Sequence, residues 1–446
     1  MWYGTPRNIQ YVGGYRVHVK KHLSFSGLRK TMSKRFRQTP DCRSGKVDFP
    51  LHDFFMSAFA MMFFQDPSLT QFQQRMKIKL NISNLQTVFG VENIPGDSQF
   101  RDVLDNSPIE ETEAIFADFL HLLQKGKQLE GYRFIEDSYL IPIDGSEYFS
   151  SEKICCPQCL TTASKGKVRF HHQILQAVIV HPDNKQVLPF APEPIRNSDG
   201  SEKQDCEINA GKRMIARIRN THPKLKIIIT GDGLYSKQPF VDALKQADML
   251  FILVAKPADH KILFEWVNDH KQLGAAHKLE FTDHKKRTHR YEWVNGIPLN
   301  GSKDADEVNF FEYSLINNNK VTFHNTWVTD IKVTDANVVN LVKGGRARWK
   351  IENETFNTLK NQGYHIEHNF GHGFKNLSHV FFLLNLLAFY LHQILELSDR
   401  IYQTCRAGFT SRKEYWNQLR CTFRVILFNS WEHMLLFIID PESQPP

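Results

Sequence analysis

Apolar positions recur at helical spacing between Val338 and Leu359. Successive positions alternate in steps of four and three, which is the period of an amphipathic helix with one inward stripe. The stripe comprises Val338, Val342, Gly345, Trp349, Glu352, Phe356 and Leu359. Glu352 should therefore face inward, whereas Glu354 lies about 200° further around the helix and should face outward. Because a buried carboxylate is unfavourable without compensation, the pattern predicts a metal ion or a cationic partner beside Glu352.

Apolar runs of strand length begin at Tyr139. Three adjacent strands are expected at 139–144, 168–182 and 186–190. They are followed by a helix, a strand, a helix and a strand at 205–220, 224–230, 238–247 and 249–255. Three strands followed by alternating helix and strand predict an α/β fold with a mixed sheet.

The segment 256–335 breaks this alternation of helix and strand. It contains Asn295-Gly296, which is typical of a hairpin turn, and residues 308–333 alternate between apolar and polar with period two. We therefore expect an inserted β-rich subdomain in this part of the chain.

Apolar helical stretches lie on both sides of the predicted sheet, at Phe49–Leu69, Ala114–Lys125, Val380–Leu397 and Phe423–Ile439. Val380–Leu397 contains Asn385, His392 and Glu396, so it is predicted to be a buried helix rather than a membrane span. The chain is therefore expected to have five regions in order: a basic helical region, the first part of the α/β core, the β insertion, a core helix carrying Glu352, and a C-terminal helical region. Their expected bounds are 1–130, 131–255, 256–335, 336–375 and 376–446.

Two more acids stand where predicted strands end. Asp144 follows YLIPI, and Asp232 follows KLKIIITG. Together with Glu352 they form a set of oxygen ligands, which is the kind that Mg²⁺ prefers. Glu193 and Glu207 are further acids near the predicted sheet, for which a metal-binding role is not favoured.

Three pieces of the chain resemble the DDE (Asp-Asp-Glu) insertion-sequence transposases: IDGSEYFSS around Asp144, GDGLY around Asp232, and RWKIENETFNTLK around Glu352. The resemblance extends over roughly residues 80–380, and the ordered trio is more specific than any one motif. It implies an RNase H-like catalytic core in which the three acids hold two Mg²⁺ ions, which Mn²⁺ can replace. It also implies that the protein is a DNA transposase, that is, a metal-dependent endonuclease and strand transferase.

Such an enzyme cleaves transposon ends and joins the 3′-OH to target DNA. Two alternatives stay open, a catalytically inactive or domesticated DNA-binding protein and a stand-alone RNase H-like nuclease. The resemblance also implies double-stranded DNA as partner, in the form of transposon terminal repeats and target DNA, and a homodimer in the synaptic complex. Scattered cysteines and the absence of an apolar signal segment in MWYGTPRNIQ favour a cytoplasmic, nucleoid-associated protein with no membrane partner.

The Glu352 helix also departs from the family pattern. Relatives that excise through a DNA hairpin carry Tyr, Arg, Glu and Lys at set intervals on this helix. Arg348 fits, Lys360 comes one residue late, and Gly345 fills the Tyr position. Arg348 and Lys360 are expected to contact DNA phosphates, whereas a hairpin intermediate is in doubt.

Positive charge is concentrated at the N-terminus. The net charge of the chain is +8, and residues 1–50 hold eleven Lys and Arg against Asp41 and Asp48, so this segment is +9 and the rest is −1. We expect DNA binding by the segment, with Lys34, Arg35 and Arg37 as contacts. The alternative is a solvated basic tail.

One cysteine pair has the spacing of half a zinc site. Cys156 and Cys159 lie in CCPQC, and His171-His172 follow on a predicted strand. Adjacent residues of a strand point to opposite faces, so only one histidine could join, and a fourth ligand would have to come from Cys155, Cys206 or elsewhere. A reduced cysteine hairpin is the favoured alternative.

Overall fold

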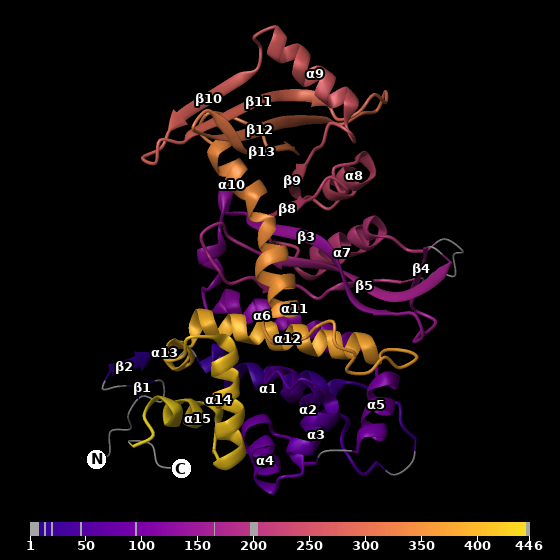
Figure 1. Cartoon of the computed structure of the whole chain (residues 1–446), viewed down its shortest axis with the longest axis vertical. Coiled ribbons are helices and arrows are strands. Elements are labelled where there is room, and N and C mark those ends of the chain that lie inside the picture. The colour runs from indigo at the N-terminus through magenta and orange to yellow at the C-terminus, as the bar shows by residue number, and fades with distance from the viewer. Residues whose placement is uncertain are drawn as a thin grey trace.

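One continuous sheet forms the upper part of the molecule in the computed structural model (Figure 1), which describes residues 9–12, 15–18, 21–44, 47–93, 96–164, 166–196 and 204–442. Within these residues the sheet has eleven strands, of which nine follow the order β10-β11-β12-β13-β9-β8-β3-β5-β4 while β6 and β7 pair with β5. The strands of the core half are β3 (Tyr139–Ser151), β4 (Leu160–Ser164), β5 (Lys167–Ile179), β6 (Leu188–Pro189), β7 (Glu193–Ile195), β8 (Ile227–Gly231) and β9 (Leu250–Val254).

The core half of the sheet is mixed, as the sequence predicts. β8 pairs in parallel with β3 and β9, whereas β5 runs antiparallel to β3. All five residues of β8 are buried, which is typical of a parallel strand covered on both faces. Helices α7 (Glu207–Thr221) and α8 (Gln238–Gln246) pack against each other and against β5 and β9, respectively. The predicted α/β class is therefore confirmed.

The insertion extends the core sheet instead of forming a sheet of its own. Its strands are β10 (His277–Thr282), β11 (Thr288–Pro298), β12 (Glu307–Asn317) and β13 (Lys320–Thr329). β13 pairs antiparallel with β9, with Trp327 opposite Val254. A helix that the pattern did not predict, α9 (Lys261–Gln272), packs on β11.

The hairpin turn predicted at Asn295-Gly296 is wrong. These two residues form an irregularity inside β11, where the register with β12 shifts between Val294 and Ile297. The Asn295 side chain donates to the carbonyl oxygen of Val333 at 3.0 Å and accepts from its backbone N–H at 2.9 Å. Gly296 does adopt a positive φ of 67°, as the Asn-Gly pair predicts. However, this conformation forms a β-bulge and not a hairpin turn.

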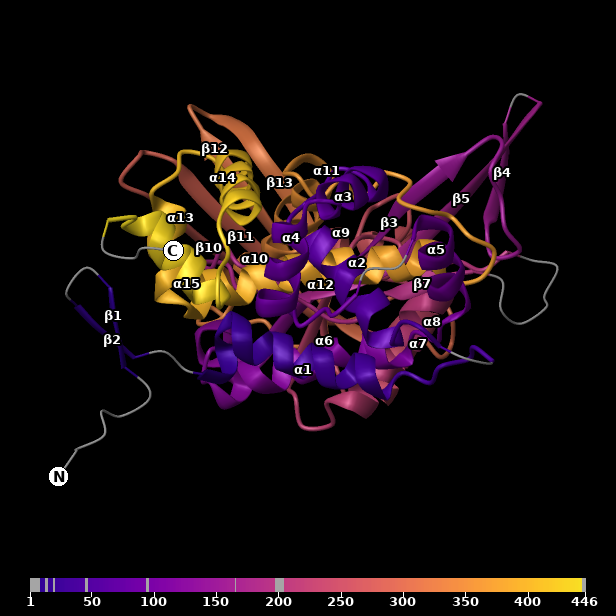
Figure 2. The same ribbon diagram turned by 90° about the horizontal axis from the view of Figure 1, so that it is seen from below.

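The two terminal regions together form one helical layer below the sheet (Figures 1 and 2). The N-terminal helices are α1 (Phe25–Gln38), α2 (Leu51–Phe63), α3 (Leu69–Met76), α4 (Lys79–Asn84), α5 (Asp97–Asn106) and α6 (Glu110–Lys125). The C-terminal helices are α12 (Leu377–Ser398), α13 (Arg400–Ala407), α14 (Arg412–Val425) and α15 (Trp431–Ile439). Phe25 stacks on Trp431 at 4.9 Å and packs on Phe63 at 5.1 Å, so aromatic rings from both ends of the chain share one core. A short hairpin, β1 (Ile9–Val12) with β2 (Tyr15–His18), precedes these helices.

Helix α12 lies at the centre of this layer. It is long and apolar enough to cross a membrane by length and composition, but 89% of its most apolar window is buried inside the protein. It contacts α2, α5 and α6 of the N-terminal region and β6 of the sheet. The prediction of a buried helix is confirmed.

Among the described residues of the basic N-terminal segment, helix α1 is part of this layer rather than a solvated tail. Helix α1 buries Phe25, Leu28, Met32 and Phe36, and the Ser24 hydroxyl caps its N-terminus. Arg7, Lys20 and Lys46 of the segment lie outside the described residues.

Candidate active site

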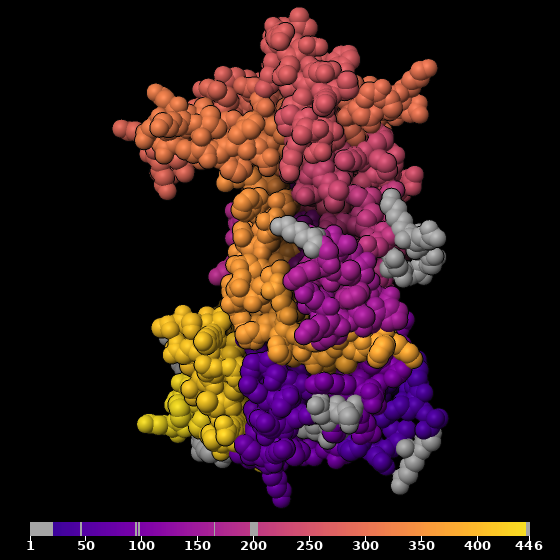
Figure 3. Space-filling model, turned by 45° about the vertical axis from the view of Figure 1, so that its right-hand side comes forward, coloured from indigo at the N-terminus to yellow at the C-terminus, as the bar shows by residue number. Residues whose placement is uncertain are grey.

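A column of helix runs along one face of the molecule and links the inserted strands to the helical layer (Figure 3). It consists of α10 (Val338–Ala347), a π-helical turn (Ile351–Phe356) and α11 (Asn357–Asn361). Two glycines bring α10 close to the sheet. A Cβ on Gly344 would meet Ile252 of β9 at 3.1 Å, and a Cβ on Gly345 would meet the Trp327 indole of β13 at 2.6 Å. The Trp327 indole thus occupies the space that a side chain at position 345 would need. Related enzymes carry Tyr at this position, and that side chain would not fit here.

The π-helical turn corrects the predicted phase of this helix. The expected stripe is right at Val338, Val342 and Gly345, but Trp349 is 54% exposed. Further along, the predicted Phe356 and Leu359 are buried, and Ile351 and Thr355 are buried beside them, because a π turn widens the helical repeat. Glu352 consequently lies at the edge of the buried stripe, with 39% of its side chain exposed. It does not carry the full desolvation that a straight helix predicts.

Glu354 also differs from its expected position. It is half-buried rather than fully outward, and its charge acts on Arg412 of α14.

Asp144 lies in β3, and Asp232 directly follows the neighbouring strand β8. The parallel pairing of β3 with β8 ends at Pro142 and Thr230, so Asp144 and Asp232 each follow their strand's last paired residue by two positions. The prediction that a strand ends at Asp144 is wrong, because β3 continues to Ser151 in antiparallel pairing with β5. Asp232 begins a turn in which its Oδ1 accepts the backbone N–H of Leu234 at 2.9 Å.

The charges of the other two predicted acids act on Asp144. The pKa of Asp144 is raised to about 7, mainly by partial burial and also by the negative charges of Glu352, Glu207 and Asp232, while the charge of Arg348 opposes the shift. Four carboxylates against one guanidinium carry a net charge of −3 when all are ionised. The oxygen-only donor set fits a hard divalent cation such as Mg²⁺.

Glu207, the fourth acid, was not favoured from the sequence. It lies in the first turn of α7, where its Oε1 accepts from the Gln173 amide at 2.6 Å and its Oε2 accepts from the Tyr235 hydroxyl at 3.1 Å. A Cβ on Gly145 would lie 2.4 Å from this carboxylate, so the glycine beside Asp144 makes room for it. The only sequence signal is the glycine in IDGS, and it does not identify its partner. Glu193 is instead held by Arg213 and Arg217 in ion pairs.

The predicted basic residues have different surroundings. Arg348 is 13% exposed and binds Glu352 at 2.7 Å, and Lys360 pairs with Glu367 at 2.8 Å. Arg35 binds Asp118 at 2.7 Å and Glu111 at 3.1 Å, both on α6, so these ion pairs compete with the predicted DNA contact. Lys34 and Arg37 are exposed on α1.

The arrangement of clustered carboxylates at adjacent strands, facing a helix-borne acid, defines a class of proteins suited to divalent-metal chemistry on phosphates. The transposase DDE domain family matches residues 137–391, more than half of the chain, and the chain belongs to this family. The match includes Asp144, Asp232 and Glu352, and it confirms the family resemblance.

One solved structure similar to this chain is described as "Cryo-EM structure of piggyBac transposase synaptic complex with hairpin DNA (SNHP)". The identity is 10%, the TM-score is 0.38, and the alignment covers 90% of this chain and 84% of that chain. Comparison with curated proteins gives no match.

Proposed function

We propose that the protein is a DNA transposase that cleaves the ends of its element and joins the freed 3′-OH to target DNA. Asp144, Asp232 and Glu352 would hold two Mg²⁺ ions, which Mn²⁺ can replace. The observation that carries the proposal is that Asp144 and Asp232 stand at the same end of two paired strands, where the charges of Glu352 and Glu207 also act on Asp144. Such a cluster is unfavourable by itself and favourable around divalent cations.

When bound, the ions would activate the attacking oxygen and neutralise the leaving oxyanion. The chain's own residues prepare that chemistry. Arg348 orients Glu352 through their ion pair, and it is close enough to Asp144 to lower its pKa. The loop after β8 is fixed by the Ser236 hydroxyl, which bonds the carbonyl of Gly233 at 3.0 Å and His260 at 2.7 Å.

The partners would be double-stranded DNA of the terminal repeats and of the target, bound by a homodimer in the nucleoid. Lys30, Lys34 and Arg37 support DNA binding, because they are exposed and spaced four and three residues apart on one face of α1. Arg348, which acts on Asp144, and Lys360 remain proposed phosphate contacts. The filled space at Gly345 argues against an excision step that uses a Tyr from this helix.

The test is cleavage and joining in vitro on DNA that carries the flanking terminal repeats. With Mg²⁺, the protein should nick at the repeat ends and join the 3′-OH ends to a target plasmid. Asp144→Asn, Asp232→Asn and Glu352→Gln should each abolish both reactions and retain repeat-specific binding. Glu354→Gln is the matched control, since it removes a carboxylate from the same turn but one that faces Arg412. Repeat-specific binding without any cleavage would favour the inactive DNA-binding protein, and cleavage without joining would favour a nuclease.

A further inference from the structure

Four soft ligand atoms converge away from the carboxylate cluster. Cys156 and Cys159 lie on the loop between β3 and β4, His172 lies on β5, and His372 lies between α11 and α12. Their sulfur and nitrogen atoms all lie within 4.8 Å of one another. The fourth residue comes from 200 positions beyond His172, so sequence spacing could not identify it.

The distances between these atoms match the edges of a tetrahedron around zinc. Zn–S bonds of about 2.3 Å and Zn–N bonds of about 2.0–2.1 Å give edges of about 3.8 Å for S to S, 3.5 Å for S to N and 3.3 Å for N to N. The Cys156 and Cys159 sulfurs are 3.8 Å apart. Nε2 of His172 is 3.5 Å from each sulfur, and Nε2 of His372 is 3.5 Å from the Cys159 sulfur. The two Nε2 atoms are 3.1 Å apart.

Surrounding contacts set the chemical form of the ligands. Nδ1 of His372 lies 3.0 Å from the carbonyl oxygen of Gly373, so it carries the proton and leaves the Nε2 lone pair free for a metal. The backbone N–H of Cys156 points at the Cys159 sulfur at 3.4 Å, which stabilises a thiolate.

The neighbours of these residues are excluded from the cluster. His171 faces the other side of β5, where its ring contacts the Thr162 hydroxyl at 3.1 Å and Glu147 at 3.3 Å. Cys155 is exposed and is not among the converging residues.

We propose that Cys156, Cys159, His172 and His372 form a structural Zn²⁺ site. Two thiolates and two neutral imidazoles balance the charge of the ion, and binding releases the two thiol protons to solvent. Four protein ligands close the coordination shell, so the site is structural and has no open position for a substrate. Its soft donors select a different metal from the carboxylate cluster.

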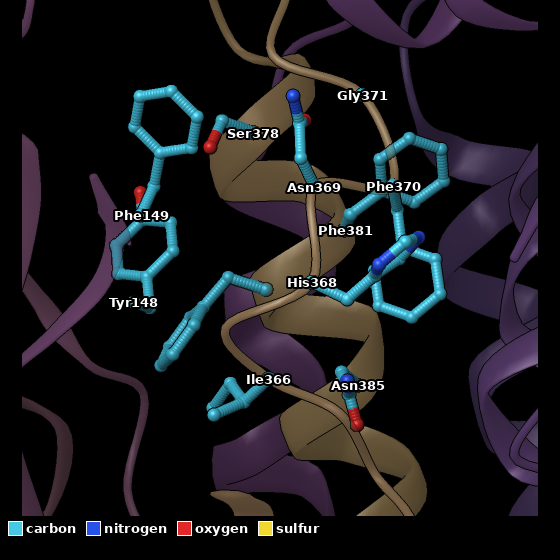
Figure 4. Close-up of a pocket in the computed structure, with 11 residues that line it drawn as sticks. Tyr148, Phe149, Ile366, His368, Asn369, Phe370, Gly371, Ser378, Phe381 and Asn385 are labelled. Carbon is cyan, nitrogen blue, oxygen red and sulfur yellow. The ribbon is translucent and has the colours of Figure 1, made fainter. Parts of the chain in front are cut away.

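The site would fasten the chain that follows the Glu352 helix to the sheet. Residues 362–376 connect α11 to α12, and part of this loop passes beside Tyr148 and Phe149 of β3 (Figure 4). The Phe149 ring packs on His372 at 4.4 Å, and the Asp105 carboxylate accepts backbone N–H groups from Phe374 to Leu377. The zinc would thus fix the lower end of the helical column relative to β3, the strand that carries Asp144.

The test uses full-length protein purified without a polyhistidine tag. Elemental analysis should find about one zinc per chain, and exchange with Co²⁺ should give the visible bands of a tetrahedral site with thiolate-to-cobalt charge transfer. Cys159→Ser and His372→Ala should lower the zinc content at least about tenfold. Cys155→Ser and His171→Ala, one residue away from two of the ligands, should leave it unchanged.

His372→Cys replaces one metal ligand with another at the same position. It therefore distinguishes the loss of a ligand from general misfolding. It should retain zinc and strengthen the thiolate charge-transfer band of the cobalt form. Wild-type protein that takes up neither zinc nor cobalt, or a mass two hydrogens lower from a Cys156–Cys159 disulfide, would overturn the proposal. So would equal zinc loss in the control variants. None of these measurements depends on transposase activity.

Discussion

The Asp144 carboxylate is partly buried, and the charges of three other acids act on it. Its raised pKa reflects both effects, and burial is the larger. The sequence predicts the acid and its position after an apolar strand, but not the degree of its burial. That depends on Glu207 and Glu352, which reach the site from helices 63 and 208 residues further along the chain.

The first prediction concerns pH. The pKa of Asp144 is about 7 in the folded protein, against the ordinary value of 3.8 that applies to the unfolded chain, so only the folded state keeps the proton between these values. Stability should therefore fall as pH rises from about 4 to about 7 in metal-free buffer. Asp144→Asn removes this loss and should be more stable than wild type by about 1–2 kcal/mol at pH 8, but not at pH 4.

Urea denaturation in EDTA at several pH values measures this difference. Mg²⁺ should raise the stability of wild type at pH 8 and should have less effect on Asp144→Asn. Asp183→Asn is the control, because that carboxylate is 85% exposed. An Asp144→Asn variant whose stability runs parallel to wild type at all pH values would contradict the prediction.

Gly145 gives a second prediction at this scale. Gly145→Ala would place a Cβ within 2.8 Å of three atoms of the Glu207 carboxyl group, which Gln173 and Tyr235 hold in place. We expect cleavage to fall at least about tenfold, since a small displacement of an active-site group is costly, while repeat binding persists. Gly131→Ala, whose Cβ would meet no atom closer than 3.9 Å, should cleave normally. Normal cleavage by Gly145→Ala would remove Glu207 from the site.

At the scale of elements, the sequence predicts which segments are helix and strand better than it predicts where they change phase. β8 is a continuous apolar run and is predicted correctly, since complete burial leaves little ambiguity. The π turn at Ile351–Phe356 has no composition signal, and neither does the exposure of Trp349, which the regular spacing places on the buried stripe. In the preceding turn of this helix, Gly345 packs on Trp327, which belongs to the inserted strands.

This shift of phase can be tested by stability. Ile351→Ala should lower the free energy of unfolding by about 2–4 kcal/mol, because Ile351 is completely buried. Trp349→Ala should change it by less than about 0.5 kcal/mol, because most of that ring is in solvent. A straight helix predicts a large loss for Trp349, so chemical denaturation of the two variants distinguishes the two geometries.

The basic residues of helix α1 are expected to have two different roles, DNA binding and internal ion pairing. Replacing Lys30, Lys34 and Arg37 with Ala should lower the slope of log affinity against log salt by up to about 0.9 for each phosphate that is no longer neutralised. Arg35→Ala should instead keep the slope and lower stability by about 1–2 kcal/mol, since its partners Asp118 and Glu111 are within the protein. Salt titration of DNA binding and thermal unfolding measure the two effects. An unchanged slope in the triple variant would assign this face of α1 to another role.

At the scale of the whole molecule, the sequence suggests two terminal helical regions, and the structure joins them. Apolar periodicity identifies α2 and α12 as buried helices, but it cannot identify the surface that buries each one. That information lies in pairs such as Phe25 with Trp431, which are separated by almost the entire chain. The helical column that carries Glu352 is therefore connected to a helical layer built from both ends of the sequence (Figure 1).

Asn84 provides the last prediction, because it connects these ends. Its amide nitrogen donates to the carbonyl oxygens of Phe423 and Ile426, each at 2.6 Å, and its Oδ1 accepts the backbone N–H of Phe428 at 2.8 Å. Asn84→Ala would leave these backbone groups without their partner and should cost about 2–4 kcal/mol. Ser83→Ala is the matched control, since that hydroxyl donates to the carbonyl oxygen of Lys79 within its own helix.

If the terminal regions form one cooperative unit, limited proteolysis of Asn84→Ala should become faster in α1 and α2 as well as in α14 and α15. Faster cleavage confined to the last two helices would mean that the regions unfold separately and that the shared aromatic core contributes little to their coupling.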